Sequence, residues 1–370
     1  MGFRQSSVEN LAVNFNFWKG KRVLVTGHTG FKGGWLALWL AELGAEVHGY
    51  ALAPNTNPNF FDTCNLRTRL VSSTIADIRD ADSLTRAMQS TSPEIVLHLA
   101  AQPLVRHSYA QPVETYAVNV MGTVNLLEAV RNTPSVRALV NVTTDKCYEN
   151  HERAEPYKET EAMGGHDPYS SSKACSELVT SAYRRSFLAP NGIHVASARA
   201  GNVIGGGDWA VDRLIPDFLR ALDQQQPLVI RSPHATRPWQ HVLEPVSGYM
   251  MLAEKLFTHG EKFAQAWNFG PRLEDSKSVQ WIVEHLCAAI PGASWRGETE
   301  QQLHEAHTLT LDSTKAHEQL GWQPKWNLTD ALRHTLNWHN AWKQDKNLHS
   351  VSLAQINEYS KAMQMAASAS

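Results

Sequence analysis

Two short motifs place acids, bases and hydroxyl groups where they could act on one substrate. Thr144, Asp145 and Lys146 follow an apolar run, and Tyr169 lies four residues before Lys173. In a helix, positions i and i+4 share a face, and an ammonium there favours the tyrosinate, so Tyr169 could take a proton from an alcohol. Oxidation alone needs no further acid and base, so Asp145 and Lys146 suggest a second reaction such as elimination. The same motifs also occur without catalytic meaning, the first as a turn and the second by chance.

The composition limits the classes of function. The chain has 370 residues, enough for one large α/β domain with an appended lobe or for two domains. Its net charge of -2 argues against a nucleic-acid-binding surface. We expect a soluble cytoplasmic protein that does not bind a membrane, because no apolar run could cross a bilayer and residues 1–16 contain no signal core. No disulfide framework or metal site is expected from the four cysteines, which are widely spaced: Cys64, Cys147, Cys175 and Cys287.

The order of apolar runs predicts the fold class. From residue 21 to about 201, short β-branched runs alternate with helical segments, which indicates βαβ units in a doubly wound (Rossmann) α/β fold with a parallel sheet. After residue 202 the sequence changes to glycine-rich turns and scattered tryptophans, which suggests a smaller α/β lobe. We therefore predict four parts: an N-terminal extension (1–18), a dinucleotide-binding domain (19–201), a substrate lobe from which some chain returns to the first domain (202–345), and a polar tail with a frayed end (346–370).

A glycine-rich loop predicts the cofactor site. Gly27-His28-Thr29-Gly30-Phe31-Lys32-Gly33 follows an apolar strand and opens a helix, so its backbone can approach a pyrophosphate at the N-terminus of that helix. Asp77 and Ile78 end the third strand, where a carboxylate could accept a hydrogen bond from an adenine amino group, although Asp77 also fits a helix cap or an Asx turn. Leu99, Ala100 and Ala101 end the fourth strand and would leave room for a ribose.

The second strand lacks one expected feature. An NAD site usually has Asp or Glu at its end for the ribose hydroxyls, whereas this strand ends Gly49-Tyr50-Ala51-Leu52. Lys32 could even help to hold a 2′-phosphate. NAD remains the predicted cofactor, with NADP as the alternative.

Together these motifs resemble the extended short-chain dehydrogenase/reductase family, specifically its nucleotide-sugar members, from about Trp18 to Trp338. The glycine loop and residues 100–106 and 144–148 are most similar to the dehydratases that act on CDP-glucose. Related dTDP-glucose and GDP-mannose dehydratases usually carry Asp-Glu where this chain has Asp145-Lys146. The resemblance thus implies an NAD-dependent nucleotide-sugar 4,6-dehydratase that feeds deoxysugar and O-antigen synthesis.

The resemblance also implies roles for the reactive residues. Tyr169 would deprotonate the glucose 4-hydroxyl during oxidation at C4, with Thr144 orienting the oxygen and Lys173 holding the ribose. Lys146 would remove the C5 proton if part of it is neutral, and Asp145 would protonate the departing C6 hydroxyl. Neighbouring Asp145 and Lys146 would by default form a charged pair, in which neither has the protonation state that its role needs.

Residues of the predicted lobe complete the site that the resemblance implies. Arg213 and Arg237 would bind the diphosphate, and either could instead be a surface charge. Asn202 would contact the phosphates or cap a turn. Gln240 and His241 are further substrate-binding candidates, although a packing role is the ordinary one for His241.

Other functions stay open at this point, and one of them is a 4,6-dehydratase that acts on another NDP-sugar. A 4-epimerase would use the same Tyr169, Lys173 and cofactor but needs neither a C5 base nor a C6 acid. The fold also serves redox-sensing modules without turnover. The predicted helices of residues 113–131 and 169–185 resemble the pair through which relatives form a four-helix interface, so we expect a homodimer or a higher homo-oligomer.

Overall fold

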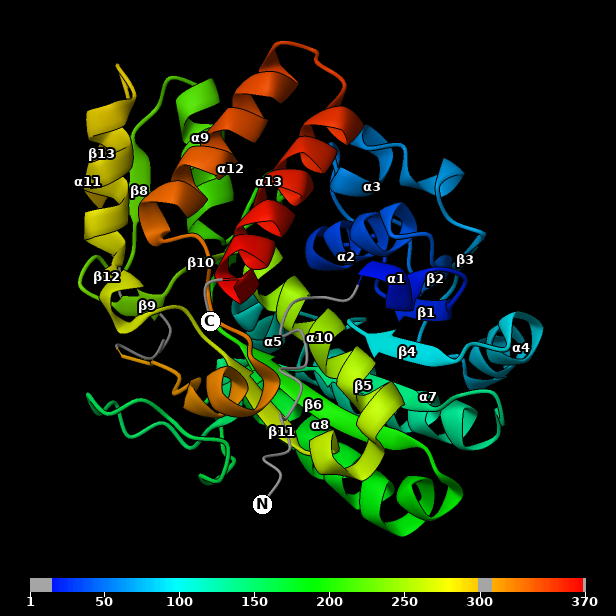
Figure 1. Cartoon of the computed structure of the whole chain (residues 1–370). Coiled ribbons are helices and arrows are strands. Elements are labelled where there is room, and N and C mark those ends of the chain that lie inside the picture. The colour runs from blue at the N-terminus through cyan, green and yellow to red at the C-terminus, as the bar shows by residue number, and fades with distance from the viewer. Residues whose placement is uncertain (1–14, 299–307, 369–370) are drawn as a thin grey trace, which may run out of the picture.

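A seven-stranded parallel sheet forms the centre of the molecule in a computed structural model that describes residues 15–298 and 308–368 (Figure 1). Residues 1–14 of the predicted N-terminal extension lie outside the described residues. The strand order is β11-β6-β5-β4-β1-β2-β3, with the reversal of a doubly wound fold between β1 and β4. The predicted fold class is therefore confirmed. The strands are β1 (Arg22–Thr26), β2 (Glu46–Ala51), β3 (Ser72–Ile75), β4 (Ile95–His98), β5 (Ala138–Val142), β6 (His194–Ala200) and β11 (Ala266–Phe269).

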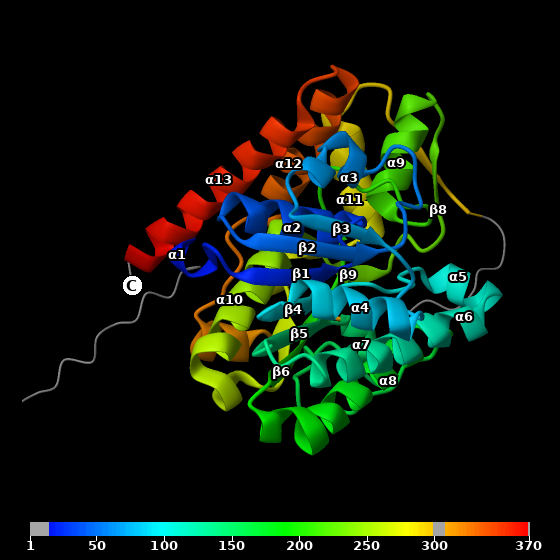
Figure 2. The ribbon, with the colours of Figure 1, turned by 90° about the vertical axis from the view of Figure 1, so that its right-hand side faces the viewer.

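Helices cover both faces of this sheet, as Figure 2 shows from the side. Successive strand residues point to opposite faces, so Val23 and Val25 pack in one core while Leu24 packs in the other. The first core contains α2 (Phe31–Glu42) and α10 (Leu243–His259). The second contains α4 (Ala81–Thr91), α7 (Gly122–Arg131) and α8 (Pro168–Tyr183).

A smaller lobe lies beyond the carboxyl ends of the strands. Its core joins residues of α9, α11, α12 and β8, including Ile215, Ile230 and Ile282. Its helices are α9 (Leu214–Asp223), α11 (Val279–Ala289) and α12 (Leu328–Lys343). Its short strands are β7 (Val203–Ile204), β8 (Leu228–Ile230), β9 (Thr236–Pro238), β10 (Gln240–His241), β12 (Ser276–Ser278) and β13 (Trp295–Gly297). The chain returns to the main sheet through α10 and through β11, which pairs with β6.

The predicted tail is a helix, which corrects the sequence interpretation. α13 (Leu348–Ser368) buries Ser352, Ile356, Tyr359 and Met363. These residues recur at intervals of three and four, so they form one helical stripe even though the segment is polar on average. The ring of Tyr359 meets that of Trp39 in α2 with centroids 5.8 Å apart. The C-terminal segment therefore packs on the helix that the glycine loop opens.

Short helices complete the described chain. No helix among the described residues is long and apolar enough to cross a membrane. A helical stretch of residues 112–131 includes one π-helical turn, Ala117–Met121, between α6 and α7. The remaining α-helices are α1 (Phe15–Trp18), α3 (Phe60–Thr63), α5 (Val105–Ala110) and α6 (Pro112–Tyr116).

Candidate active site

A cavity of about 710 Å³ lies where the carboxyl ends of the central strands face the lobe. All predicted cofactor-binding and catalytic residues line it, and so do three of the five predicted substrate-binding residues. The cofactor-binding set is Gly27, Thr29, Gly30, Phe31, Gly33, Asp77, Ile78, Leu99, Ala100 and Ala101. The others are Thr144, Asp145, Lys146, Tyr169, Lys173, Asn202, Arg213 and Arg237.

The glycine loop leaves no room for side chains at two positions. Gly27 has φ +78, and a Cβ there would lie 2.7 Å from the backbone nitrogen of Ala100. A Cβ on Gly33 would lie 2.1 Å from the carbonyl oxygen of Gly27. Gly30 caps α2 without a side-chain hydrogen bond, so the first N–H groups of the helix are available to an anion. This cradle fits a dinucleotide pyrophosphate.

The adenosine end of the predicted cofactor site has an unusual polar lining. The Asp77 carboxylate accepts hydrogen bonds from the backbone and side chain of Arg79, which hold its pKa below the ordinary value. Asp77 thus forms the turn contact that the sequence left open, while it also lines the cavity. Thr29 donates to the carbonyl oxygen of Leu52 at 2.8 Å and ties the glycine loop to the chain just after β2.

Helix α8 brings Tyr169 and Lys173 into the cavity on one face. Burial raises the pKa of Tyr169, and the negative charge of Asp145 raises it further, whereas a hydrogen bond with Thr144 and the Arg213 guanidinium lower it. Burial lowers the pKa of Lys173 to about 8, and its Nζ donates to the carbonyl oxygen of Val142 at 3.4 Å. The positive charge that favours the tyrosinate therefore comes from Arg213 of the lobe.

Asp145 and Lys146 do not form the charged pair that their adjacency suggested. Thr144 donates to Oδ1 of Asp145 at 2.9 Å, and no ion pair links the two neighbours, both of which the structure describes. Oδ2 of Asp145 is buried without a hydrogen-bond partner among the described residues. Burial raises the pKa of Asp145, although Lys146, Thr144 and Arg237 each act to lower it. Asp145 is thus suited to carry a proton, and Lys146 is the more exposed of the two.

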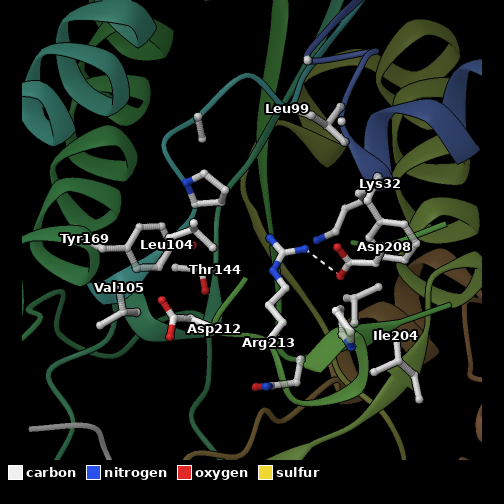
Figure 3. A pocket seen from close by; sticks show the side chains of 18 of the residues that line it. Lys32, Leu99, Leu104, Val105, Thr144, Tyr169, Ile204, Asp208, Asp212 and Arg213 are labelled. Carbon is white, nitrogen blue, oxygen red and sulfur yellow. Dashed lines mark hydrogen bonds and ion pairs between the residues drawn. The ribbon is translucent and has the colours of Figure 1, made fainter. Parts of the chain in front are cut away.

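Cations from the lobe and from α2 converge opposite Tyr169 (Figure 3). Arg213 pairs with Asp208 at 2.9 Å, and Lys32 lies beside this pair. Burial, Arg213 and Lys173 lower the pKa of Lys32 to about 7. Lys32 therefore faces the catalytic end of the cavity, which corrects the idea that it holds a 2′-phosphate at the adenosine end. Asp208 follows a conspicuous glycine run, but its role as the partner of Arg213 could not be inferred from local sequence.

Arg237 and Asn202 approach the same space from the lobe. Arg237 is 6% exposed, so it is not a surface charge, and its Nη1 donates to the carbonyl oxygen of Thr236 at 3.0 Å. The backbone oxygen of Asn202 accepts a hydrogen bond from Gln240 at 3.0 Å, which leaves its side chain at the cavity wall.

Gln240 and His241 lie in the core and do not line the cavity, so their assignment to substrate binding was wrong. Nε2 of Gln240 donates to the carbonyl oxygen of Phe269 at 2.8 Å. His241 is fully buried beside Trp326, with ring centroids 4.8 Å apart, and burial lowers its pKa well below the ordinary value. The short strand they form places its backbone near the site but turns both side chains into packed interior.

A buried ion pair supports the catalytic strand ends from behind. Both oxygens of Glu177 accept hydrogen bonds from Arg199, and Glu177 also accepts from Thr143 and Ser197. Because Thr143 directly precedes the reactive triplet, this network fixes the end of β5. Sequence reasoning missed Glu177, since the pairing partners are far apart in the chain.

Comparison with known proteins agrees with this geometry. The family model described as GDP-mannose 4,6 dehydratase matches residues 24–335. The chain is 53% identical to CDP-glucose 4,6-dehydratase of Salmonella typhimurium over 95% of this chain and 99% of the relative. It is 27% identical to UDP-glucose 4-epimerase of Halalkalibacterium halodurans over 86% of this chain and 95% of that one.

A solved structure of a nucleotide-sugar dehydratase has the same fold. A crystal structure of dTDP-glucose 4,6-dehydratase from Streptomyces venezuelae with NAD bound superposes with a TM-score of 0.76 at 25% identity, and the match covers 88% of this chain and 98% of that one. The chain therefore belongs to the GDP-mannose 4,6 dehydratase family, within the extended short-chain dehydrogenases/reductases.

Proposed function

We propose that this protein is an NAD-dependent CDP-glucose 4,6-dehydratase, which forms CDP-4-dehydro-6-deoxy-glucose and water. The observation that carries the proposal is the environment of Asp145. Its buried carboxyl group has a raised pKa and a free oxygen in the same cavity as Tyr169. An epimerase needs no such proton donor beside the oxidising tyrosine. The 53% identity to the Salmonella enzyme supports CDP-glucose as the substrate.

The cofactor would lie along the glycine loop. Gly27, Gly30 and Gly33 would hold the pyrophosphate against the start of α2, with Ile78 and residues 99–101 along the adenosine and ribose. Bound there, NAD would supply the hydride-transfer chemistry between C4 and C6 of the sugar. Lys173 would hold the ribose hydroxyls and so fix the cofactor beside Tyr169.

The first chemical role belongs to Tyr169. As a tyrosinate it takes the proton of the 4-hydroxyl. Thr144 would turn its single hydroxyl proton from Oδ1 of Asp145 to the same sugar oxygen and so orient it. Because burial disfavours the tyrosinate, the positive charge of Arg213 contributes by lowering the pKa of Tyr169.

The elimination follows from the acidity of C5 once C4 is a ketone. Lys146 takes the C5 proton, and Asp145 gives its proton to the C6 oxygen as the C6–O bond breaks and water leaves. Lys146 then returns a proton to C5 when C6 is reduced. In each turnover Tyr169 gains one proton and Asp145 loses one. Exchange of these two protons with solvent restores the resting enzyme.

The diphosphate would lie between the lobe and α2. Arg213 and Arg237 supply guanidinium groups, and Asn202 supplies an amide at the cavity wall. Lys32 would add a further cation on the opposite side, where it faces Arg213.

Incubation with CDP-, dTDP- and UDP-glucose and GDP-mannose, with NAD or NADP added, tests the proposal. We expect a 4-keto-6-deoxy product, one water lighter by mass spectrometry, mainly from CDP-glucose with NAD. A product of unchanged mass and inverted C4 would instead establish an epimerase.

We also propose a homodimer formed through α8 and the helical stretch of residues 112–131. Three large apolar side chains are exposed there: Val113 at 82%, Met121 at 53% and Leu178 at 59%. The helical segments that carry them pack against one another, and exposed apolar side chains on neighbouring helices are typical of a protein interface.

A further inference from the structure

The cavity continues beyond the catalytic residues into the lobe. At that end its lining comes from the start of α9 and from β8, with Ile215, Leu228 and Ile230 as apolar walls. If the substrate is a nucleotide sugar, as proposed above, its sugar lies at Tyr169 and its diphosphate at Arg213. The nucleoside must then extend to this lobe end, where its base would meet those apolar walls.

Helix α9 contributes one polar side chain, that of Asp217, to this end of the cavity, next to the proposed diphosphate site. Arg213 is the N-cap of α9, and Asp217 follows one turn later, with its backbone N–H bonded to the carbonyl oxygen of Arg213 at 2.9 Å. Both Arg213 and Asp217 line the cavity, so the carboxylate lies one turn of chain beyond the guanidinium at the same end of α9. A ligand that runs along this face meets the guanidinium first and the carboxylate next.

The Asp217 carboxylate is held in place and keeps one oxygen for a ligand. Nη1 of Arg220 donates to Oδ1 at 2.5 Å. Oδ2 has no hydrogen-bond partner in the part of the chain that the structure describes. Burial raises the pKa of Asp217, while Arg220 and Arg231, which is also paired with Asp212 at 2.7 Å, lower it and so favour the ionised carboxylate. Asp217 is thus a fixed acceptor beside an apolar slot.

The pyrimidine bases differ at position 4 of the ring, where such an acceptor could form a hydrogen bond. Cytosine carries an amino donor at N4, whereas uracil and thymine carry a carbonyl acceptor at O4. An ionised carboxylate can only accept. It would form a charge-assisted hydrogen bond with cytosine and would face the O4 of uracil or thymine as a second acceptor without a proton between them.

We propose that Asp217 selects cytosine, by accepting a hydrogen bond from the N4 amino group through Oδ2. This assignment rests on the proposed function for the position of the nucleotide, and it adds the residue that distinguishes CDP-glucose from UDP- and dTDP-glucose. Asp217 contacts the base and not the reacting atoms, so it determines specificity without taking part in the chemistry.

The Asp217→Asn variant tests this directly. Its amide oxygen can still accept from Arg220, while its NH₂ group now donates toward the base. By isothermal titration, we expect CDP to bind about 10- to 100-fold more weakly than to the wild type and UDP to bind more tightly, with the same shift in kcat/KM for CDP- against UDP-glucose. Asp223→Asn is the matched control, because it removes the same charge from α9 outside the cavity, where Asp223 pairs with Lys343 at 2.9 Å, and it should leave the CDP/UDP preference unchanged.

The outcomes separate this inference from the proposed function. Wild-type protein that prefers CDP, together with an Asp217→Asn variant that keeps this preference at an unchanged melting temperature, would overturn the role of Asp217. Equal weakening of CDP and UDP would also overturn it. Wild-type protein that binds CDP selectively but dehydrates no nucleotide sugar would contradict the proposed function instead, and the binding comparison would still decide on Asp217.

Discussion

Asp145 and Lys146 are neighbours in the chain but occupy different surroundings. The carboxyl group is buried, accepts a hydrogen bond from Thr144 and has a raised pKa, while Lys146 is the more exposed residue of the two. The positive charge of Lys146 lowers the pKa of Asp145, but burial outweighs it, so Asp145 can carry the proton that its proposed role needs. The different surroundings allow the two residues to be tested independently.

We predict that Lys146→Ala and Asp145→Asn stop the reaction at different steps. In heavy water, Asp145→Asn should still exchange the C5 proton of the sugar for deuterium but should release product about 10²- to 10⁴-fold more slowly. Lys146→Ala should lose the exchange as well. Mass spectrometry of recovered substrate and product measures both. Retained C5 exchange in Lys146→Ala would rule out the lysine as the C5 base.

Local sequence placed the proposed reactive residues in the cavity more reliably than the proposed binding residues. Tyr169 and Lys173 were recognisable because helical spacing alone puts them on one face. Gln240 and His241 were not, since the contacts that bury them come from Phe269 and Trp326, which no local pattern connects. Lys32 was misplaced for the same reason, because the direction of its side chain depends on charges from the lobe.

At the scale of elements, the glycine loop is a close contact between backbone segments. Gly33 packs on the carbonyl of Gly27, which in turn packs on the backbone after β4. The strand and helix pattern made this loop and the parallel sheet predictable. Helix α13 was not predicted, because only one narrow stripe of it is apolar. That stripe is buried by packing on α2, a contact that the local sequence does not show.

We predict that Gly33→Ala disrupts cofactor binding. The new methyl group would lie 2.1 Å from the Gly27 oxygen, so the loop must shift. Overpacking of this kind costs about 1–3 kcal/mol, and we expect NAD to bind roughly 10- to 100-fold more weakly by titration. Gly297→Ala is the control, because a Cβ there meets nothing within 4 Å. Equal NAD affinity in both variants would show that the loop tolerates the shift.

At the scale of the whole molecule, the proposed dimer predicts a change in assembly. Leu178→Asp would place a charge at the exposed leucine of α8. We expect the wild type to elute as a dimer and the variant as a monomer in size-exclusion chromatography with light scattering, because an unpaired charge is costly to bury in an interface. Val229→Asp, which alters an exposed apolar residue in the lobe, should remain dimeric. A wild-type monomer would disprove this interface.

The attachment of the C-terminal segment depends on one buried carboxyl group. Glu244 of α10 is fully buried, and it accepts hydrogen bonds from the backbone N–H groups of Lys325 and Trp326 and from the hydroxyl of Tyr359 in α13. Burial raises the pKa of Glu244 to about 7 despite these bonds. One side chain thus links α10 to the segment just before α12 and to α13.

This environment predicts how stability depends on pH. Because the folded pKa of Glu244 lies above its unfolded value of about 4.3, its contribution is fully present below that value and is lost as pH rises through about 7. The loss from this group is on the order of 3 kcal/mol in the free energy of unfolding. Thermal unfolding between these limits should therefore show the wild type losing stability relative to Glu244→Gln as pH rises. The exposed Glu318→Gln should keep the wild-type slope, and an identical slope in Glu244→Gln would mean that other groups cause the dependence.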